Sequence, residues 1–305
     1  MNRQTLLTLL TTFALLFSLS FSCNAKGKDK AKHVVFIGLD GWGAYSLPKA
    51  DMPNVKKLME DGAYTLKKRS ALPSSSAINW ASMFMGAGPE LHGYTEWGSK
   101  TPELPSRVLN KNGIFPTVFQ LLRDARPEAE IGCLYEWEGI KYLVDTLLMS
   151  YHYHVADCNK APKELGNVAS SYIKEKHPAL VAICYDSPDH TGHTEGHDTP
   201  AYYEKLKELD TYVGQIVQAV KDAGILDDII FILTSDHGGI NKGHGGKTMQ
   251  EMETAFIISG KNIKKGLRFD DMSMMQYDVA STITSIFNLE QPQVWIGRPM
   301  KMVFK

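Results

Sequence analysis

The sequence predicts an α/β fold with helices on both faces of a mostly parallel sheet. Two observations predict it. From residue 33 onward, segments typical of strands and of helices alternate along the chain, and this alternation is the pattern of parallel strands joined by crossover helices. The strand segments are short, almost continuous apolar runs, which are typical of strands buried on both faces. A central sheet covered on both sides is therefore expected.

Apolar runs mark the predicted strands. The first, His33–Leu39, reads HVVFIGL and ends directly before Asp40. Further runs predict strands over residues 129–135, 179–185, 228–234 and 254–259. Arg69 belongs to another strand, which precedes the second helix.

Proline and glycine mark the ends of several predicted helices. Residues 53–61 begin with Pro53 and are followed by Gly62, an order favoured at helix starts and stops. Ser76–Met85 is the second helix, and a segment rich in glycine and proline ends it. A long amphipathic helix covers residues 200–223. The remaining helices are predicted over residues 116–124, 165–176 and 276–288.

The first 25 residues are typical of an export signal and are not counted as part of the fold. Arg3 supplies a positive start, and residues 6–21 are apolar or hydroxyl residues without a charge. This run is shorter than the roughly 20 apolar residues that span a bilayer, which argues against a transmembrane anchor. Two processing routes stay open, namely cleavage after Ala25 and a bacterial lipoprotein signal that leaves a lipid on Cys23. Both predict an exported protein, which is periplasmic, an outer-membrane lipoprotein or secreted.

Composition argues for a substantial hydrophobic core and against a nucleic-acid binder. The net charge is -1 and 43% of the 305 residues are hydrophobic, so binding to a nucleic-acid duplex is not expected. We expect a single domain over residues 33–305, with a small irregular cap over about residues 95–160. Cys133 and Cys158 could pair in an oxidising compartment, but their spacing does not decide this.

Three acidic sites follow three predicted strands. Asp40 follows the first strand. Asp186 and Asp189 come after the 179–185 strand, and Asp236 comes after the next strand. Because ligands bind at the carboxyl ends of strands in open α/β sheets, these carboxylates are expected to converge on one site.

Histidines accompany two of these carboxylates. Asp189 and His193 lie four residues apart, and His237 directly follows Asp236. His244 lies in a glycine-rich loop that can bend back over the end of the sheet. Mixed Asp and His ligand sets suit zinc and related first-row metals. Each motif alone is more often a polar turn, but their joint placement after strands favours a metal site.

Ser76 is the candidate nucleophile. It ends the run Ser74-Ser75-Ser76 at the predicted start of the second helix. A helix N-terminus favours negative charge, so it would stabilise an alkoxide or a phosphate. The alternative is that these serines only cap the helix.

Taken in order, these motifs resemble the alkaline phosphatase superfamily, and within it the type I phosphodiesterase / nucleotide pyrophosphatase branch. The resemblance extends over residues 33–305 and implies an alkaline-phosphatase-like fold. Each motif is weak alone, whereas the ordered series is specific. The matching segments are Gly38-Leu39-Asp40-Gly41, Ser76-x-x-Asn79, Met85-Gly86 with Pro89-Glu90-x-His92-Gly93, Asp186-Ser187-Pro188-Asp189-x-x-Gly192-His193-x-x-Gly196, Ser235-Asp236-His237-Gly238 and His244-Gly245.

The resemblance implies two divalent metal ions, with zinc the expected metal. One ion would be held by Asp189, His193 and His244. The other would be held by three further residues, which are Asp40, Asp236 and His237.

The resemblance also implies a covalent mechanism. Ser76 would attack phosphorus and form a phospho-serine intermediate, and Asn79 would donate a hydrogen bond to a phosphoryl oxygen. Many diesterases of this branch carry threonine where Ser76 stands and proline where Ile78 stands. The choice among the three serines therefore rests on the spacing to Asn79.

The expected substrate is a small phosphate ester or nucleotide, cleaved by a phosphodiesterase or nucleotide pyrophosphatase. A phosphomonoesterase on the same site and a catalytically inactive metal- or phosphate-binding protein are the alternatives. Diesters are expected to be preferred, because Asn79 offers a neutral donor and Arg69 lies on a strand. Lys100, Lys141 or Arg123 reaching over from the cap would favour monoesters instead. The candidate substrate contacts are Trp80, Tyr94, Lys141 and His197, the last at a position that is often proline in this branch.

Overall fold

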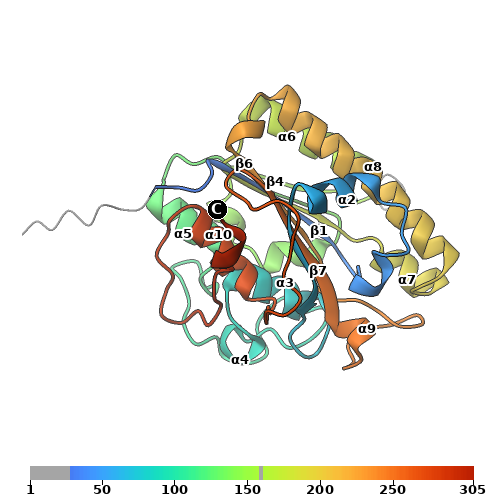
Figure 1. The fold of residues 1–305 in the computed structure, drawn as a ribbon. Helices are drawn as coiled ribbons and strands as arrows, with labels where there is room; N and C mark the ends of the chain where they lie inside the picture. The colour runs from blue at the N-terminus through green and yellow to red at the C-terminus, as the bar shows by residue number, and fades with distance from the viewer. Residues whose placement is uncertain (1–27, 158–160) are drawn as a thin grey trace, which may run out of the picture.

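An eight-stranded sheet runs through the middle of the molecule (Figure 1). The structure is a computed structural model that describes residues 28–157 and 161–305. The strands lie in the order β4-β3-β5-β1-β6-β7-β2-β8. Their bounds are β1 (His33–Leu39), β2 (Gly62–Arg69), β3 (Ile131–Tyr135), β4 (Tyr151–His154), β5 (Leu180–Tyr185), β6 (Ile229–Thr234), β7 (Glu253–Gly260) and β8 (Leu267–Arg268).

Most of the sheet is parallel, as the sequence predicts. β1 pairs in parallel with β5 and β6, and β3 pairs in parallel with β4 and β5. β7 is the exception, because it runs antiparallel to both of its neighbours, β6 and β2. The chain returns from β6 to β7 through a loop that carries only the short helix α9 (Met249–Met252). Without a crossover helix, the returning strand enters the sheet in the opposite direction.

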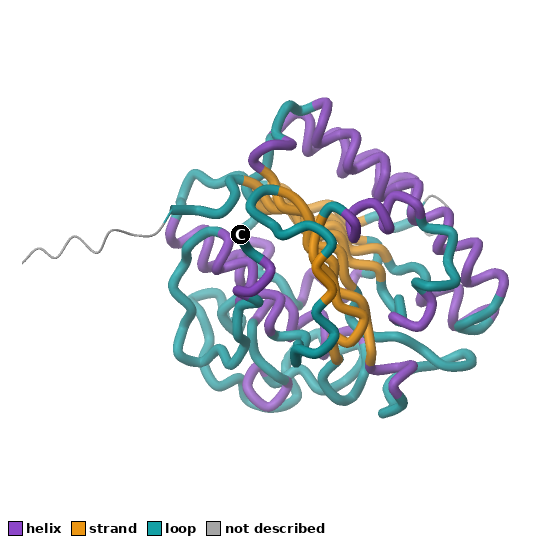
Figure 2. Tube along the Cα trace, viewed as in Figure 1, coloured by secondary structure: helices purple, strands orange, loops and turns teal. Residues whose placement is uncertain are grey.

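Helices cover both faces of the sheet (Figure 2). The contacts of α8 with α2 and α6 place these three helices on one face, and the contacts of α10 with α3 and α5 place the other three on the opposite face. The helices α4, α7 and α9 are shorter. The bounds are α2 (Pro53–Glu60), α3 (Ser76–Met85), α4 (Pro89–His92), α5 (Val118–Ala125), α6 (Lys163–Lys176), α7 (Asp189–Glu195), α8 (Pro200–Asp222) and α10 (Asp278–Ile286).

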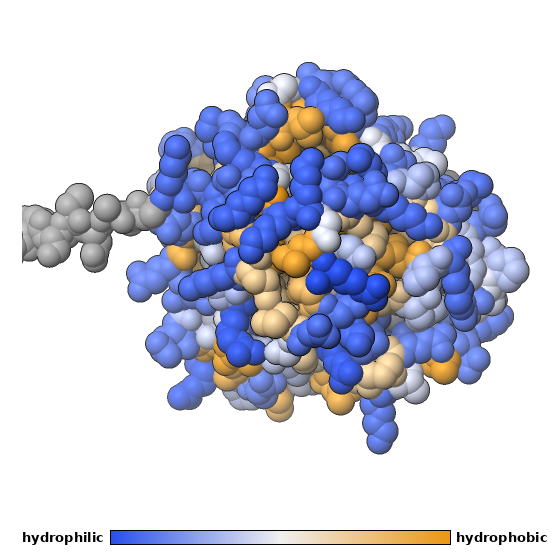
Figure 3. Space-filling model, in the orientation of Figure 1, coloured by the Kyte–Doolittle hydropathy of each residue, from blue (hydrophilic) through white to orange (hydrophobic). Residues whose placement is uncertain are grey.

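Successive side chains of β1 enter two separate cores. Val34 and Phe36 pack with the side of α3, α5 and α10, whereas Val35 and Ile37 pack with the side of α2, α6 and α8. This alternation explains the almost continuous apolar sequence of the strand, since both of its faces are buried. The face shown in Figure 3 is covered mostly by hydrophilic side chains, with small hydrophobic areas between them.

The 95–160 range holds regular elements as well as loops. It contains α5, and β3 and β4 form one edge of the main sheet. Cys133 lies on β3 as a buried free thiol, whereas Cys158 and the predicted export segment with Cys23 lie outside the described residues. Within the described ranges, none of the helices has the length and apolar character needed to cross a bilayer.

Candidate active site

Three carboxylates meet at one end of the sheet. The strands β5, β1 and β6 are neighbours, and Asp189, Asp40 and Asp236 follow them at their carboxyl ends. The backbone N–H of Asp189 donates to the Asp40 carbonyl oxygen at 3.0 Å, which ties two of the loops together. All three side chains are buried. The structure therefore brings together the three carboxylates that the sequence places after neighbouring strands.

Asp189, His193 and His244 form one group of candidate metal ligands. Asp189 begins α7, so His193 lies one turn later on the same side, with Nε2 3.0 Å from Asp189 Oδ2. His244 comes from the loop after β6 and places its Nε2 3.6 Å from the same oxygen. Nδ1 of His193 faces the Lys242 carbonyl oxygen at 3.0 Å. Such a contact holds the ring and leaves Nε2 to bind a metal.

Asp40, Asp236 and His237 surround a second position. Nε2 of His237 lies 3.4 Å from Asp40 Oδ1 and 3.3 Å from Asp236 Oδ2. Its Nδ1 faces the Gly238 carbonyl oxygen at 2.7 Å, so Nε2 is again the nitrogen that points into the site. Ligand atoms of Asp40, Asp189 and His237 also lie within 4.8 Å of one another. The two groups are therefore direct neighbours.

The buried carboxylates of the site repel one another unless cations balance their charges. Asp40 Oδ1, Asp189 Oδ1 and Asp236 Oδ2 are buried without a hydrogen-bond partner. Burial and the charge of Asp236 raise the pKa of Asp40 well above its ordinary range, and burial and the charge of Asp189 raise the pKa of Asp236 to about 7. Buried like charges are unfavourable unless a cation balances them. Three carboxylates and three imidazoles are a donor set that suits two divalent ions of the zinc type.

The hydrogen bond between Asp189 and His193 shifts the pKa values of both side chains. It raises the pKa of His193 to about 9. Burial is the largest single effect on Asp189 and opposes its ionisation, but the hydrogen bond from His193 together with the charges of the three nearby histidines outweighs burial and lowers the pKa of Asp189. In the metal-free protein this hydrogen bond therefore favours the charged forms of both side chains.

Ser76 begins α3 with its hydroxyl directed at the second group. Ser76 Oγ is 3.1 Å from His237 Nε2. Ser75 Oγ instead lies 3.4 Å from His244 Nδ1, and Ser74 Oγ donates to the Gly246 carbonyl oxygen at 2.6 Å. The three serines therefore have three different partners. Ser76 also lies at the first position of α3, where the helix dipole favours an anion.

The sequence model of the type I phosphodiesterase / nucleotide pyrophosphatase family matches residues 34–244. The chain belongs to this family. Mouse bis(5'-adenosyl)-triphosphatase enpp4 is 26% identical over 221 residues, which are 69% of this chain and 48% of that relative. Mouse ectonucleotide pyrophosphatase/phosphodiesterase family member 1 is 24% identical over 214 residues, 67% of this chain and 24% of that relative. The chain thus spans about half or less of the length of these relatives.

Solved structures share the alkaline-phosphatase-like fold. Murine ectonucleotide pyrophosphatase / phosphodiesterase 5, an inactive variant in complex with AMP, matches with a TM-score of 0.69 and 15% identity, covering 89% of this chain and 98% of that one. A 2-O GAG sulfatase matches with a TM-score of 0.72 and 14% identity, covering 90% of this chain and 74% of that one. At these identities the likeness shows the fold alone.

Asn79 holds the loop that carries the serines. Its Oδ1 accepts a hydrogen bond from the Ala71 N–H at 2.7 Å. Its Nδ2 donates to the carbonyl oxygens of Ala71 and Pro73, each at 3.2 Å, and of Ser75 at 3.0 Å. Both amide hydrogens are therefore committed, and no donor is left for a phosphoryl oxygen. Asn79 therefore holds the loop in place in this structure, and the phosphoryl contact that the family resemblance implies stays a prediction.

Trp80 and Tyr94, two of the candidate substrate contacts, are buried. Trp80 is 1% exposed, and its indole N–H donates to Asp40 Oδ2 at 2.8 Å. It therefore supports a candidate metal ligand from behind. Tyr94 is 3% exposed and donates to the Tyr142 carbonyl oxygen at 3.0 Å, which ties it to the short 3-10 helix Glu138–Tyr142.

The cations of the predicted cap have partners of their own. Lys141 pairs with Glu138 at 2.6 Å. Lys100 and Lys141 both lie against the ring of Tyr142, at 5.5 and 4.9 Å from its centroid. Arg123 donates to the carbonyl oxygens of residues 129 and 148 at 2.8 and 3.0 Å. The structure therefore shows none of these three side chains paired with a carboxylate of the site.

A buried lysine behind the site is not among the residues that the sequence predicts. Lys68 on β2 is fully buried, and its Nζ donates to the Ser235 carbonyl oxygen at 2.7 Å and to the Gln276 side chain. Gln276 donates to the Ser235 carbonyl oxygen at 3.1 Å and to the Asp236 carbonyl oxygen. Burial lowers the pKa of Lys68 well below its ordinary value. The only sequence signal was strand alternation, which turns Lys67 to solvent and Lys68 inward.

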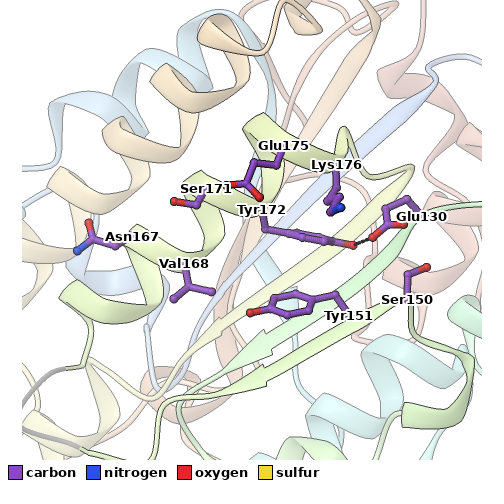
Figure 4. Close-up of a pocket in the computed structure, with 9 residues that line it drawn as sticks. All are labelled: Glu130, Ser150, Tyr151, Asn167, Val168, Ser171, Tyr172, Glu175 and Lys176. Atoms are coloured by element: carbon purple, nitrogen blue, oxygen red, sulfur yellow. Dashed lines mark hydrogen bonds between the residues drawn. The ribbon is translucent and has the colours of Figure 1, made fainter.

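A separate cavity of about 440 Å³ lies between α6 and the β4 edge of the sheet (Figure 4). Tyr151 and Tyr172 stack there with ring centroids 4.9 Å apart, and Tyr172 donates to Glu130 at 2.8 Å. The lining contains none of the predicted site residues. The candidate chemistry therefore belongs to the carboxyl ends of β5, β1 and β6.

Proposed function

We propose that this protein is a two-metal hydrolase that cleaves phosphodiester or pyrophosphate bonds through a phospho-Ser76 intermediate, with zinc as the metal. One observation carries the proposal. Ser76 Oγ lies 3.1 Å from His237 Nε2, beside buried carboxylate oxygens that have no partner. The alternative of simple helix capping is disfavoured, because Ser75 occupies the N-cap position of α3 and its side chain makes no capping hydrogen bond.

The mechanism assigns the covalent steps to Ser76. Two divalent ions, when bound, lower the pKa of the serine hydroxyl and neutralise charge on the attacking and leaving oxygens. Ser76 releases its hydroxyl proton to solvent, and Oγ then forms a bond to phosphorus while the bond from phosphorus to the leaving oxygen breaks. In the second step a water oxygen bonds to phosphorus, the bond to Oγ breaks, and Oγ regains a proton.

Other residues hold this arrangement in place. The N-terminus of α3 stabilises negative charge at Ser76. Asn79 fixes the loop before α3 through its four backbone contacts. Trp80 holds Asp40 by its indole N–H. None of these groups needs to move a proton during the reaction.

We infer that diesters or nucleotides are preferred over monoesters. A monoester dianion gains from an additional cation near the nucleophile. Lys141 instead pairs with Glu138, and Arg123 donates hydrogen bonds to backbone carbonyl oxygens. The family relatives named above are a bis(5'-adenosyl)-triphosphatase and a nucleotide pyrophosphatase/phosphodiesterase, which supports the same substrate class.

We also propose that the mature protein is exported. The support is the charge and apolar pattern of residues 1–25. Mass spectrometry of the mature N-terminus distinguishes the two routes, since a lipid on Cys23 adds acyl mass and cleavage after Ala25 leaves an unmodified Lys26. An intact Met1 in protein from the native host would contradict export.

The substrate class is tested by comparing kcat/KM for nitrophenyl phosphate, bis-nitrophenyl phosphate and a nucleotide nitrophenyl ester. We expect the diester or the nucleotide ester to be favoured at least about tenfold, which corresponds to about 1.4 kcal/mol of transition-state stabilisation. Ser76→Ala is the control for contaminating activity. A monoester favoured by the same factor would overturn the diester preference and leave the two-metal site standing.

A further inference from the structure

His197 is a buried histidine without a hydrogen-bond partner. It is 4% exposed, and neither ring nitrogen forms a hydrogen bond. His92, which is also buried, instead places its Nε2 3.1 Å from the Ser82 hydroxyl. Buried polar groups are nearly always paired, so the place of His197 in the fold needs an explanation.

The polar atom that faces His197 belongs to a candidate metal ligand. His197 Nε2 lies 3.4 Å from Asp189 Oδ1, which is itself buried without a partner. His193 and His244 approach the other oxygen of Asp189, Oδ2, at 3.0 and 3.6 Å. His197 therefore meets the carboxylate at the oxygen that the two ligand histidines leave alone.

Two glycines form the slot that holds the imidazole ring. A Cβ at Gly192 of α7 would lie 2.3 Å from His197 Cε1, and a Cβ at Gly239 would lie equally close. The backbone N–H of His197 donates to the Asn241 carbonyl oxygen at 2.6 Å. Gly196, directly before it, has a φ of 99°, which favours glycine. The ring is thus fitted between the two segments that carry the metal ligands.

We propose that His197 is a positioning residue whose Nε2–H donates a hydrogen bond to Asp189 Oδ1 and so directs Oδ2 toward the metal held with His193 and His244. The proposal rests on the two-metal site proposed above. A carboxylate that accepts a hydrogen bond on one oxygen is held as a ligand through the other. A small movement of either side chain brings the 3.4 Å contact to hydrogen-bond length.

The test measures zinc binding directly. His197→Ala, His197→Gln and the control His92→Ala are compared with the wild type for zinc content, for zinc affinity by chelator competition and for unfolding temperature without metal. The wild type is expected to hold about two zinc ions, and His197→Ala to weaken one of them by about 10- to 100-fold. His197→Gln, whose amide can donate, recovers part of this loss. His92→Ala lowers the unfolding temperature and leaves zinc affinity unchanged.

The outcomes separate this proposal from the proposed function. A wild type that binds no divalent metal overturns both. A wild type with two zinc ions and a folded His197→Ala variant of equal affinity overturns only the positioning role. Zinc X-ray absorption is expected to show the same number of histidine ligands in wild type and variant, and loss of one imidazole would make His197 a ligand itself. If His197→Ala does not fold, His197→Gln gives the answer. The Gln amide can donate the hydrogen bond to Asp189, so complete loss of the zinc ion held with His193 and His244 in this variant would contradict the proposal.

Discussion

At the scale of single residues, three consecutive serines acquire different roles from their partners. Ser74 binds a backbone carbonyl, Ser75 lies against His244, and Ser76 faces His237. Their local sequence is nearly the same, so the difference comes from the direction in which each hydroxyl points as the chain enters α3. Ser76 alone combines the first position of the helix with the group formed by Asp40, Asp236 and His237.

Ser76→Ala is expected to lower kcat by at least about 10³-fold, because it removes the group that forms the covalent intermediate. Ser75→Ala is the matched control and is expected to retain activity within about tenfold. Steady-state kinetics with zinc content determined on the same samples is the measurement, and both variants should keep their metal. An inactive Ser75→Ala beside an active Ser76→Ala would assign the nucleophile to Ser75.

At the scale of elements, the loop after β6 depends on a buried clamp from β2 and from the segment just before α10. Lys68 and Gln276 together bind the carbonyl oxygens of Ser235 and Asp236. The Ser70 hydroxyl also donates to the Asp236 carbonyl oxygen, at 2.7 Å. Side chains outside the two ligand groups therefore hold the loop that carries Asp236 and His237.

Lys68→Met is expected to destabilise the fold by about 1–3 kcal/mol, because it leaves the Ser235 carbonyl oxygen and the Gln276 side chain with fewer partners. Zinc affinity at the Asp236 group should fall as the loop loosens. Lys67→Met is the matched control at the exposed neighbouring position, with an expected change within about 0.5 kcal/mol. Urea unfolding in chelator and zinc competition test both effects, and a Lys68→Met protein unchanged in both would contradict the clamp.

At the scale of the whole molecule, the acidic end of the sheet couples stability to pH. In the metal-free protein, burial raises the pKa of Asp236 to about 7 and of Glu136 to about 8, and the Asp189 contact raises that of His193 to about 9. A folded pKa above the unfolded one means that the folded state binds the proton more tightly. The resulting stability is present at low pH and is lost as pH rises through the folded pKa. Lys68, with its lowered pKa, acts in the opposite sense.

Metal-free protein should therefore lose thermal stability as pH rises from about 6.5 to about 8, because the three groups with raised pKa values outnumber Lys68 in this range. The buried histidines with lowered pKa values are neutral in the folded state there, and above about pH 7.5 they are neutral in the unfolded state as well, so their opposition is confined to the start of the window. Saturating zinc should remove most of the loss, because the cations replace the bound protons. Unfolding temperatures measured with chelator and with zinc across this window provide the test. A metal-free protein that gains stability over this window would contradict the assigned pKa shifts.

Much of the fold and the ligand set could be predicted because their signals are local. The apolar run of β1 and the amphipathic pattern of α8 are encoded within single segments. The ends of parallel strands meet at one edge of a sheet, so Asp40, Asp189 and Asp236 could be expected together from their positions in the chain. The helix α7 is not among the helices that the sequence predicts, because its glycine and threonine residues weaken the helical signal.

What the sequence by itself determined is most of the buried strands and longer helices and the chemical groups that follow them. Only the tertiary structure decided the direction of β7, the commitment of Asn79 to backbone carbonyls, and the burial of Lys68 and of His197. The physical reason is that a side chain's burial and partners depend on segments brought beside it from far along the chain. His197 shows this directly, since glycines 47 residues apart in sequence, Gly192 and Gly239, form its slot.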